Sequence, residues 1–439
     1  MSATIFALAT PAGRSGVAII RISGPQAGAV LRAITQRDLP KPRVAARRKF
    51  YAGQSTASAM IDDGLVLWFP GPASFTGEDM VELHVHGGPA IIAAMAETLA
   101  AQGLQHAEPG AFTRRAFDHG KLDLTEVEGL ADLIAAETES QRRQALRQME
   151  GVFGTQVETW RGGLLGALAR IEAAIDFPEE DLPVGLIEGV DAAMHAINSA
   201  IASTLDDDHR GERLRDGLNV VILGAPNAGK SSLMNALARR DVAIVSEEAG
   251  TTRDVIELHL DLGGYPVLLA DTAGLRESEN RIESEGVRRA LDRAARADLK
   301  LVVLDGTEWP EIPEATRAQI DAASVLVLNK ADLLKAVPEG PVIAVSALTG
   351  AGIADLLAAL KERAGQLLAA GDQPVLTRLR HREALEDCRR CLTRGLAIGP
   401  VELKAEELRL ATRALGRITG RVDVEDVLDV IFREFCIGK

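Results

Sequence analysis

The segment "GAPNAGKS", Gly224 to Ser231, has the G-x-x-x-x-G-K-S spacing of a phosphate-binding loop. Its glycines let the backbone turn so that N–H groups point at phosphate oxygens. Lys230 adds a positive charge, and the hydroxyl of Ser231 can ligate Mg²⁺. An apolar run precedes the segment and a helical pattern follows it, as such a loop requires. The spacing therefore predicts a site for a nucleoside phosphate.

The segment "NKAD", Asn329 to Asp332, indicates which base is bound. Guanine presents two donors, N1–H and a 2-amino group, and the carboxylate of Asp332 can accept both. Adenine presents neither, so it would leave the carboxylate unpaired. Ser346 and Ala347, after a later apolar run, would complete the base pocket. We therefore predict that the nucleotide is GTP.

The residues expected around the γ-phosphate leave the hydrolytic group open. Asp271 in "DTAG" is placed to hold Mg²⁺ through water, and Gly274 can sense the γ-phosphate. Where Ras-like proteins have a water-positioning glutamine, this chain has Leu275, which cannot hydrogen-bond water. The nearby "SEEAGTTRD" offers Thr252 for Mg²⁺ and Arg253 for charge stabilisation, although such charges are also typical of solvated loops. Another group must therefore compensate for the missing glutamine.

Five apolar runs must position these segments. They alternate with helical stretches in the order expected of a doubly wound parallel sheet. Ligands of such sheets bind beyond the carboxyl ends of the strands, where the segments above fall. The predicted strands cover residues 219–223, 265–271, 299–305, 324–329 and 341–346.

Helical patterns on both sides of this unit predict that it is an insertion. Residues 121–214 and 372–439 are rich in Ala, Leu, Glu and Arg at helical spacing. We expect one discontinuous helical domain around a nucleotide-binding domain at 215–371. In the second half, Cys388 and Cys391 share a helix face with leucines and lack a second cysteine pair, so we expect them in the core rather than in a zinc or redox site.

A strand within the first 120 residues, in "MVELHVHGGPAI", alternates between apolar and polar side chains. A carboxylate and two imidazoles on one face could bind a metal, but nothing nearby clearly completes the shell. A structural polar face is the alternative. The apolar set is Val81, Leu83 and Val85, and the polar set is Glu82, His84 and His86.

The composition predicts a cytoplasmic protein of two to four domains. No run reaches the roughly 18 apolar residues that a membrane span requires. Three cysteines in 439 residues argue for a reducing compartment, and the amino end lacks the basic region of a secretory signal. The net charge of −14 disfavours binding nucleic acid by bulk electrostatics. The basic run Lys41 to Lys49 remains a local candidate, or a solvated loop.

The terminal "FCIGK" places Cys436 fourth from the end. Prenylation would use this position, but Lys439 fits neither usual terminal class. A buried structural thiol is an alternative. Residues 427–435 are apolar at helical spacing and should pack a last helix on the core, which would leave residues 436–439 projecting.

These segments resemble the MnmE (TrmE) family of tRNA-modification GTPases. The resemblance rests on "GAPNAGKSSLMNAL", "AGTTRD", "DTAGLRE", "NKAD" and "FCIGK", and it covers essentially the whole chain. It implies a multidomain α/β and α+β protein. A folate-binding-like, dimerising α+β domain at 1–120 would precede a Ras-like doubly wound G domain at 215–371, which is inserted into a helical domain at 121–214 and 372–439.

The resemblance also implies how hydrolysis proceeds without the glutamine. In the family a K⁺ ion replaces an arginine finger when two G domains meet across GTP, and an acid corresponding to Glu283 positions water. Arg276 is a further candidate catalytic residue. The positions that look like K⁺ ligands are Asn227, Ser246, Glu248 and Thr251, and Ser231 and Thr252 would hold Mg²⁺. The expected GTP contacts are Asn227, Ala228, Gly229, Lys230, Ser231, Ser232, Ser246, Thr251, Thr252, Asp271, Thr272, Ala273, Gly274, Asn329, Lys330, Asp332, Ser346 and Ala347.

For the first domain, the resemblance adds a folate reading of the polar strand face. The pterin ring carries the same amide and amino donors as guanine, so Glu82 would accept them as Asp332 accepts those of guanine. The cofactor would be 5,10-methylene- or 5-formyl-tetrahydrofolate, and Cys436 would take part in one-carbon transfer. Ala111 departs from the family, which commonly has Glu there. The remaining folate contacts would be Arg21, Lys121 and Lys439.

The resemblance therefore implies a homodimeric, cytoplasmic GTPase that works with the flavoprotein MnmG (GidA), the carrier of FAD and NADH. The pair would add a (carboxymethyl)aminomethyl group to C5 of the wobble uridine of certain tRNAs, and GTP hydrolysis would drive G-domain dimerisation and conformational change. A ribosome-assembly switch GTPase is the alternative, but it should carry a basic RNA-binding module. A folate-dependent aminomethyltransferase acting on other substrates would need no nucleotide switch.

Overall fold

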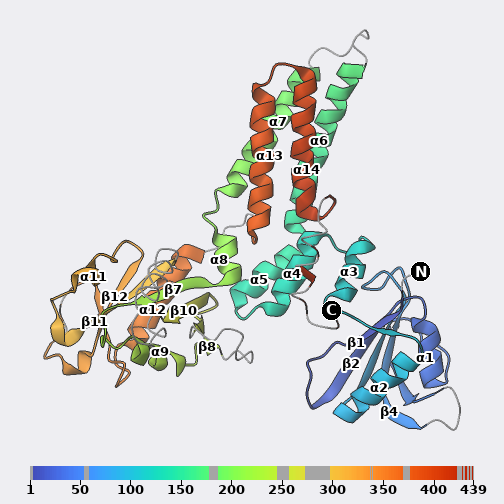
Figure 1. The fold of residues 1–439 in the computed structure, drawn as a ribbon, viewed down its shortest axis with the longest axis horizontal. Coiled ribbons are helices and arrows are strands. Elements are labelled where there is room, and N and C mark those ends of the chain that lie inside the picture. The colour runs from blue at the N-terminus through green and yellow to red at the C-terminus, as the bar shows by residue number, and fades with distance from the viewer. Residues whose placement is uncertain are drawn as a thin grey trace, which may run out of the picture. The chain divides into compact units, whose positions relative to one another are not determined.

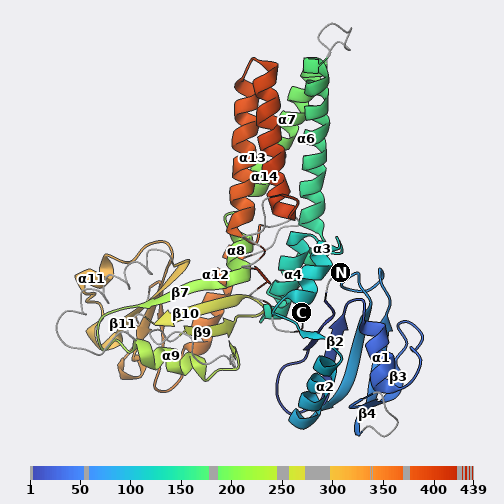
Figure 2. The same ribbon diagram turned by 45° about the vertical axis from the view of Figure 1, so that its right-hand side comes forward.

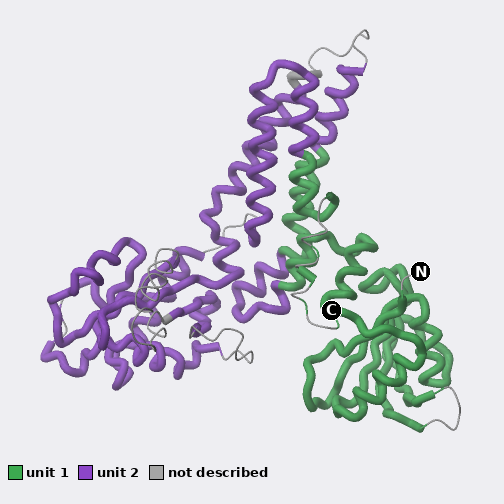
Figure 3. Tube along the Cα trace, in the orientation of Figure 1, with its two compact units in different colours: residues 1–131, 148–162, 412–439 green, residues 132–147, 163–411 purple. Residues whose placement is uncertain are grey.

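The computed structural model describes the chain except for residues 1–2, 54–58, 177–185, 245–256, 272–296, 337, 339, 369–375, 423–427, 429–430, 433–434, 436–437 and 439; for residues 186–188 and 271 it describes the backbone alone. Contacts divide the chain into two compact units (Figure 3). Unit 1 consists of residues 1–131, 148–162 and 412–439, and unit 2 of residues 132–147 and 163–411. The predicted domain boundaries stay predictions.

Unit 1 is built on a six-stranded sheet with the order β3-β4-β5-β2-β1-β6. Neighbouring strands are antiparallel, except that β1 and β6 run parallel. The strands are β1 (Ile5–Leu8), β2 (Ser15–Ser23), β3 (Ala46–Tyr51), β4 (Met60–Phe69), β5 (Met80–Gly87) and β6 (Gln105–His106).

One face of this sheet is buried under α1 (Ala27–Thr35) and α2 (Pro89–Ala101), which share a hydrophobic core with the strands. Val81, Leu83 and Val85 on β5 belong to that core, so the predicted apolar face is confirmed. In the β2–β5 ladder Arg21 stands opposite Glu82, so both residues project from the other face.

The carboxyl end of the chain packs in unit 1 against α4 (Leu124–Ala135), which follows α3 (Ala111–Asp118). Leu124 and Val127 form a cluster with described residues of the tail. The described residues of the last apolar stretch therefore pack on a core at helical spacing, as predicted. They are Leu428, Ile431, Phe432 and Phe435. The prediction that residues 436–439 project from this core is wrong for Gly438, which is buried and whose carbonyl oxygen accepts a hydrogen bond from Arg21.

Unit 2 contains a seven-stranded sheet of order β13-β12-β11-β7-β10-β9-β8. The five predicted strands all form and run parallel, whereas β9 and β8 add an antiparallel edge that the sequence did not indicate. The strands are β7 (Leu218–Leu223), β8 (Ala243–Ile244), β9 (Glu257–Asp261), β10 (Pro266–Asp271), β11 (Leu299–Asp305), β12 (Ser324–Asn329) and β13 (Val342–Ala344).

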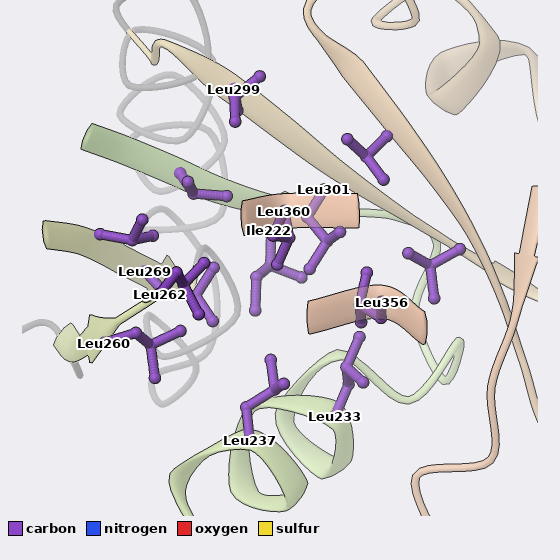
Figure 4. Close-up of a cluster of buried hydrophobic side chains, with 14 of the residues drawn as sticks. Ile222, Leu233, Leu237, Leu260, Leu262, Leu269, Leu299, Leu301, Leu356 and Leu360 are labelled. Atoms are coloured by element: carbon purple, nitrogen blue, oxygen red, sulfur yellow. The ribbon is translucent and has the colours of Figure 1, made fainter. Parts of the chain in front are cut away.

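Both faces of this sheet are buried, which explains why its strands are nearly continuous apolar runs. On one face, β-strand residues such as Ile222 and Leu301 pack against α9 (Lys230–Ala238) and α12 (Ile353–Leu368) (Figure 4). On the other face, a second cluster contains Val302 and Leu328. The short helices are η2 (Gly306–Glu308), α11 (Glu314–Arg317) and η3 (Ala331–Leu333). The order and directions of the strands are those of a Ras-like G domain.

Long helices flank the G-domain sheet in sequence, as the prediction of an insertion requires. They are α5 (Glu139–Met149), α6 (Val152–Asp176), α7 (Leu186–Leu205) and α8 (Arg210–Asp216) before it, and α13 (Leu379–Ala397) and α14 (Val401–Thr419) after it. In both ribbon views α6, α7, α13 and α14 run side by side (Figures 1 and 2). Ion pairs join α14 to each of the other three: Arg409 to Glu172, Lys404 to Asp191 and Glu407 to Arg394.

The two cysteines of α13 lie in the core of this helical part, as predicted. Burial raises the pKa of the Cys388 thiol and also that of the Cys391 thiol. Both thiols therefore stay protonated and pack as small apolar groups. None of the helices in the described part of the chain has the length and apolar character needed to cross a membrane.

Candidate functional site

The phosphate loop connects β7 to α9, whose first residue is Lys230. Gly224 and Gly229 have φ values of +146° and +91°, which residues with a side chain rarely adopt. A Cβ on Gly224 would lie 2.2 Å from the carbonyl oxygen of Val303. The two glycines are thus required by the backbone path that turns the start of α9 toward the loop, where helix N–H groups can receive an anion.

The ammonium group of Lys230 lies over this loop. Its Nζ donates to the carbonyl oxygens of Gly224 and Ala225, both at 2.9 Å. Ser231 and Ser232 follow on the exposed side of the helix start. Positive charge and hydroxyl oxygens therefore meet at one edge of the loop, which is the donor set that a nucleotide phosphate and its Mg²⁺ would need.

Asn329, at the end of β12, joins the phosphate loop to the base side of the site. Its Nδ2 donates to the carbonyl oxygen of Ala228 at 2.9 Å, and its Oδ1 accepts from the N–H of Ala347 at 3.1 Å. The side chain is only 3% exposed. One buried amide therefore connects three segments that lie far apart in the sequence.

The predicted base contacts gather beyond β12 and β13. Lys330 donates to the carboxylate of Asp305 at 2.6 Å, while the carboxylate of Asp332 is exposed. Ser346 is buried, and its hydroxyl accepts from the N–H of Thr349 at 3.1 Å. Partial burial acts to raise the pKa of Asp305, but hydrogen bonds from Lys330 and Thr307 outweigh it, so the pKa lies below its usual value. This carboxylate stays ionised at neutral pH and holds Lys330 beside the base pocket.

Asp271 ends β10 opposite Ile222 of β7, so its backbone lies beside the strand that leads into the phosphate loop. Its side chain lies outside the described residues. The other predicted residues in 245–256, in 272–296 and in the tail lie wholly outside the described residues. They are Ser246, Glu248, Thr251, Thr252, Thr272, Ala273, Gly274, Arg276, Glu283, Cys436 and Lys439.

A second site is a cleft of about 400 Å³ in unit 1, on the polar face of its sheet. Nη2 of Arg21 donates to Oε1 of Glu82 at 2.9 Å, and Nη1 donates to the carbonyl oxygen of Gly438 at 3.2 Å. The structure thus brings two predicted folate residues together and adds the tail. Lys121 is exposed and is not among the lining residues, which are Arg21, Arg43, Phe69, Ala73, Ser74, Phe75, Met80, Glu82 and Leu130.

Sequence reasoning missed the aromatic part of this cleft. The guanidinium carbon of Arg21 lies 5.8 Å from the ring centroids of both Phe75 and Phe112. Attraction between the guanidinium and both rings helps to hold the Arg21 side chain in place. No local spacing indicated them, because the three residues come from distant segments.

The metal hypothesis for the polar strand face receives no support. Glu82 is engaged with Arg21, and His86 pairs instead with Asp62, its Nδ1 lying 2.9 Å from Oδ1. Nε2 of His84 lies 3.6 Å from Oε2 of Glu82. Among the residues that the structure describes, no group of three or more His, Cys, Asp or Glu is arranged to hold a metal ion.

The strand order, the phosphate loop and the "NKAD" segment at the strand ends define a GTP hydrolase of the Ras-like class. Two family models match the chain: the MnmE helical domain over residues 124–436, and the GTP-binding protein TrmE N-terminus over residues 4–121. The chain belongs to the MnmE family.

Two full-length relatives agree with this assignment. The chain is 55% identical over 447 residues to the tRNA modification GTPase MnmE of Paramagnetospirillum magneticum, covering 100% of both chains. It is 58% identical over 442 residues to that of Parvibaculum lavamentivorans, covering 99% of this chain and 100% of the relative. Among solved structures, it is 25% identical to the G domain of the FeoB iron transporter of T. maritima, with a TM-score of 0.25, over 34% of this chain and 98% of that one.

Replacing Gly229 by Ala tests the close approach between the phosphate loop and Asn329. The new Cβ would lie 2.1 Å from Nδ2 of Asn329, at a φ that disfavours any side chain. We expect the affinity for GDP, measured by calorimetry, to fall about 10- to 100-fold. Gly166→Ala is the control, because a Cβ there meets nothing within 4 Å. Equal affinities of the two variants would contradict the assigned geometry.

Proposed function

We propose that this chain is a potassium-stimulated GTPase of the cytoplasm that modifies tRNA as a homodimer with the flavoprotein MnmG. Together they would use a folate one-carbon unit to add a (carboxymethyl)aminomethyl group to C5 of the wobble uridine of certain tRNAs. The observation that carries the proposal is the cleft in which Arg21 holds Glu82 and the tail carbonyl of Gly438, in a chain that also contains the GTP site. Relatives that are 50–58% identical over nearly the whole chain are tRNA modification GTPases.

In the G domain, Lys230 and the N–H groups of the phosphate loop would bind the phosphates, and Asp332 would select guanine. Ser231 and Thr252 would hold Mg²⁺, while Glu283 and Arg276 would act on the attacking water and on the developing charge. A bound K⁺ would stabilise negative charge at the bridging oxygen of GTP. Asn227 supports this assignment, because it is exposed on the phosphate loop, where its side-chain oxygen is accessible to a cation. The proposed K⁺ ligands are Asn227, Ser246, Glu248 and Thr251.

In the front domain, the chemistry of the cleft fits a folate. Glu82 offers a carboxylate to the amide and amino donors of a pterin, and the rings of Phe69 and Phe75 offer flat apolar walls. Arg21 keeps the carboxylate in place and would contribute a positive charge. Lys121 and Lys439 would contact the rest of the cofactor, which when bound would supply a carbon at the oxidation level of formaldehyde or formate.

The tail supports a chemical role for Cys436. Phe435, on one side of it, is buried in the unit 1 cluster, and Gly438, on the other side, contacts Arg21. A Cβ on Gly438 would lie 2.3 Å from the carbonyl oxygen of Leu8, so the chain is closely held there. We propose that the thiol takes part in one-carbon transfer at this cleft.

A ribosome-assembly switch is the competing function. It would share the G domain, but it should present a basic surface to RNA. The net charge of −14 and the Arg21–Glu82 cleft favour the tRNA-modification proposal instead.

Folate binding tests the front domain. Glu82→Ala removes the acceptor of the pterin donors, so we expect the affinity for 5-formyl-tetrahydrofolate to fall at least about 10- to 100-fold in calorimetry. Glu97→Ala, at an exposed position of α2, should bind like the wild type. Absence of binding by the wild-type chain would refute this part of the proposal.

Potassium dependence tests the proposed cation site. At equal ionic strength we expect GTP hydrolysis to be about 100-fold faster in K⁺ than in Na⁺. Asn227→Ala should lose the difference, whereas Asn235→Ala, exposed on α9, should keep it. Equal rates of GTP hydrolysis in the two salts would contradict a role for K⁺ in the mechanism. Because some ribosomal GTPases also use K⁺, this result does not separate the two functions.

Mass spectrometry of the wobble nucleosides of tRNA distinguishes tRNA modification from a role in ribosome assembly. In cells that lack this chain, we expect modified uridine to return with the wild-type gene and not with Cys436→Ser, provided that the variant still hydrolyses GTP. Restoration by both would make the thiol structural. An unchanged nucleoside profile in the deletion strain would reject the tRNA assignment and favour the ribosome switch.

A further inference from the structure

Residues 132–147, here called the α4–α5 segment, belong to unit 2 although the chain on both sides of them belongs to unit 1. The segment contains the last turn of α4 and most of α5. Its contacts within unit 2 are with the G-domain sheet and its connections, and they use side chains that none of the roles above requires.

Asp132 bonds to both ends of the G domain. Its Oδ1 accepts from Nε of Arg215 at 3.0 Å and from Nη2 of Arg378 at 2.8 Å. Arg215 lies in the last turn of α8, directly before β7, and Arg378 directly precedes α13. The side chains of Asp132 and Arg378 are 14% and 12% exposed, so water screens this pair only partly. One carboxylate therefore holds the chain where it leads into the G domain and where it leads out.

Further along the segment, α5 bonds to the α8 connection. Nε2 of Gln141 donates to the carbonyl oxygen of Arg215 at 2.9 Å, and Nε2 of Gln144 donates to that of Gly211 at 2.8 Å. These bonds fix the register of α5 against the start of the G domain.

The same segment also bonds to the β9–β10 hairpin. Nδ1 of His259 on β9 lies 2.8 Å from Oε2 of Glu137, and the N–H of Ser140 donates to the carbonyl oxygen of Gly264 at 3.1 Å. Gly264 lies in the turn between the two strands. The α4–α5 segment thus contacts the hairpin at its turn and at one side chain of β9.

The β9–β10 hairpin lies next in the sequence to the segments predicted to contact Mg²⁺ and the γ-phosphate. β9 begins directly after residues 245–256, which include the predicted Mg²⁺ ligand Thr252, and β10 ends at Asp271. Loops that contact the γ-phosphate and Mg²⁺ commonly change between GTP and GDP states. In the sequence the hairpin lies between the two segments predicted to contact Mg²⁺ and the γ-phosphate, so a change in either segment would reach the hairpin first.

We propose that the conformation of the α4–α5 segment depends on whether GTP or GDP is bound, and that its contacts with the β9–β10 hairpin transmit this difference. Glu137 and Asp132 are positioning residues in this role. Glu137 holds the hairpin through His259, and Asp132 keeps the segment aligned with the two connections of the G domain. This role rests on the GTPase activity and is independent of the folate and tRNA assignments.

A passive scaffold would explain the Asp132 cluster but not the hairpin contacts. The side chains of Glu137 and His259 are 32% and 40% exposed, and a side-chain contact this exposed contributes little to folding stability. Their removal should therefore leave the fold and the nucleotide site intact while uncoupling the segment from the hairpin. This difference makes the proposal testable.

Hydrogen exchange of the full chain, in GDP and in a non-hydrolysable GTP analogue, tests it. In the wild type we expect exchange of the amides in residues 132–147 to differ at least about fivefold between the two nucleotides. Glu137→Gln should lose this difference, with unchanged GDP affinity and unchanged protection of α9. Glu139→Gln is the matched control, because Glu139 is exposed and pairs with Arg142 and Arg143 of its own helix. It should keep the difference.

His259→Gln and the double variant of Glu137 and His259 complete a double-mutant cycle. If the pair acts as a unit, the double variant loses no more of the nucleotide response than either single variant. Asp132→Asn should also lose the nucleotide-dependent difference in exchange. If this variant also lowers the affinity for GDP, the test rests on the Glu137 and His259 variants. No nucleotide-dependent exchange in residues 132–147 of the wild type, or a full response in Glu137→Gln, would overturn the proposal.

Discussion

The buried side-chain amide of Asn329 is the interaction on which the nucleotide site depends. It satisfies the carbonyl of Ala228 in the phosphate loop and the N–H of Ala347 in the base loop at the same time. Removing it would leave two backbone groups without their partner in a region closed to water. Because Gly229 lies directly against the amide, the phosphate loop can approach it only where a side chain is missing. The amide of Asn329 therefore holds the phosphate and base halves of the site together.

The sequence predicted the parts of the fold that local patterns control. The five parallel strands were visible because burial on both faces leaves nearly continuous apolar runs, as in β11 and β12. The alternation around Glu82 gave the correct faces of β5, since successive side chains of a strand point to opposite sides. Cys388 and Cys391 were correctly placed in the core because they share a helix face with leucines and no second cysteine pair completes a zinc site.

Contacts between distant segments could not be predicted in this way. Arg21 and Gly438 are 417 residues apart, so no spacing rule relates them, and the aromatic rings around Arg21 come from other segments again. β9 was missed because "ELHLD" is short and mixes charged with apolar residues, and its position is fixed by pairing with β10. The bonds of Asp132 to Arg215 and Arg378 likewise depend on where the chain returns after the G domain.

The GTP site lies in unit 2, and the cleft around Arg21 and Glu82 lies in unit 1. Calorimetry of GDP binding to Asn329→Ala tests most directly the claim that Asn329 holds the GTP site together. We expect the affinity to fall about 100-fold, because two backbone groups lose their partner. Asn235→Ala, exposed on α9, should bind GDP like the wild type. An Asn329→Ala affinity within about twofold of the wild type would contradict the claim.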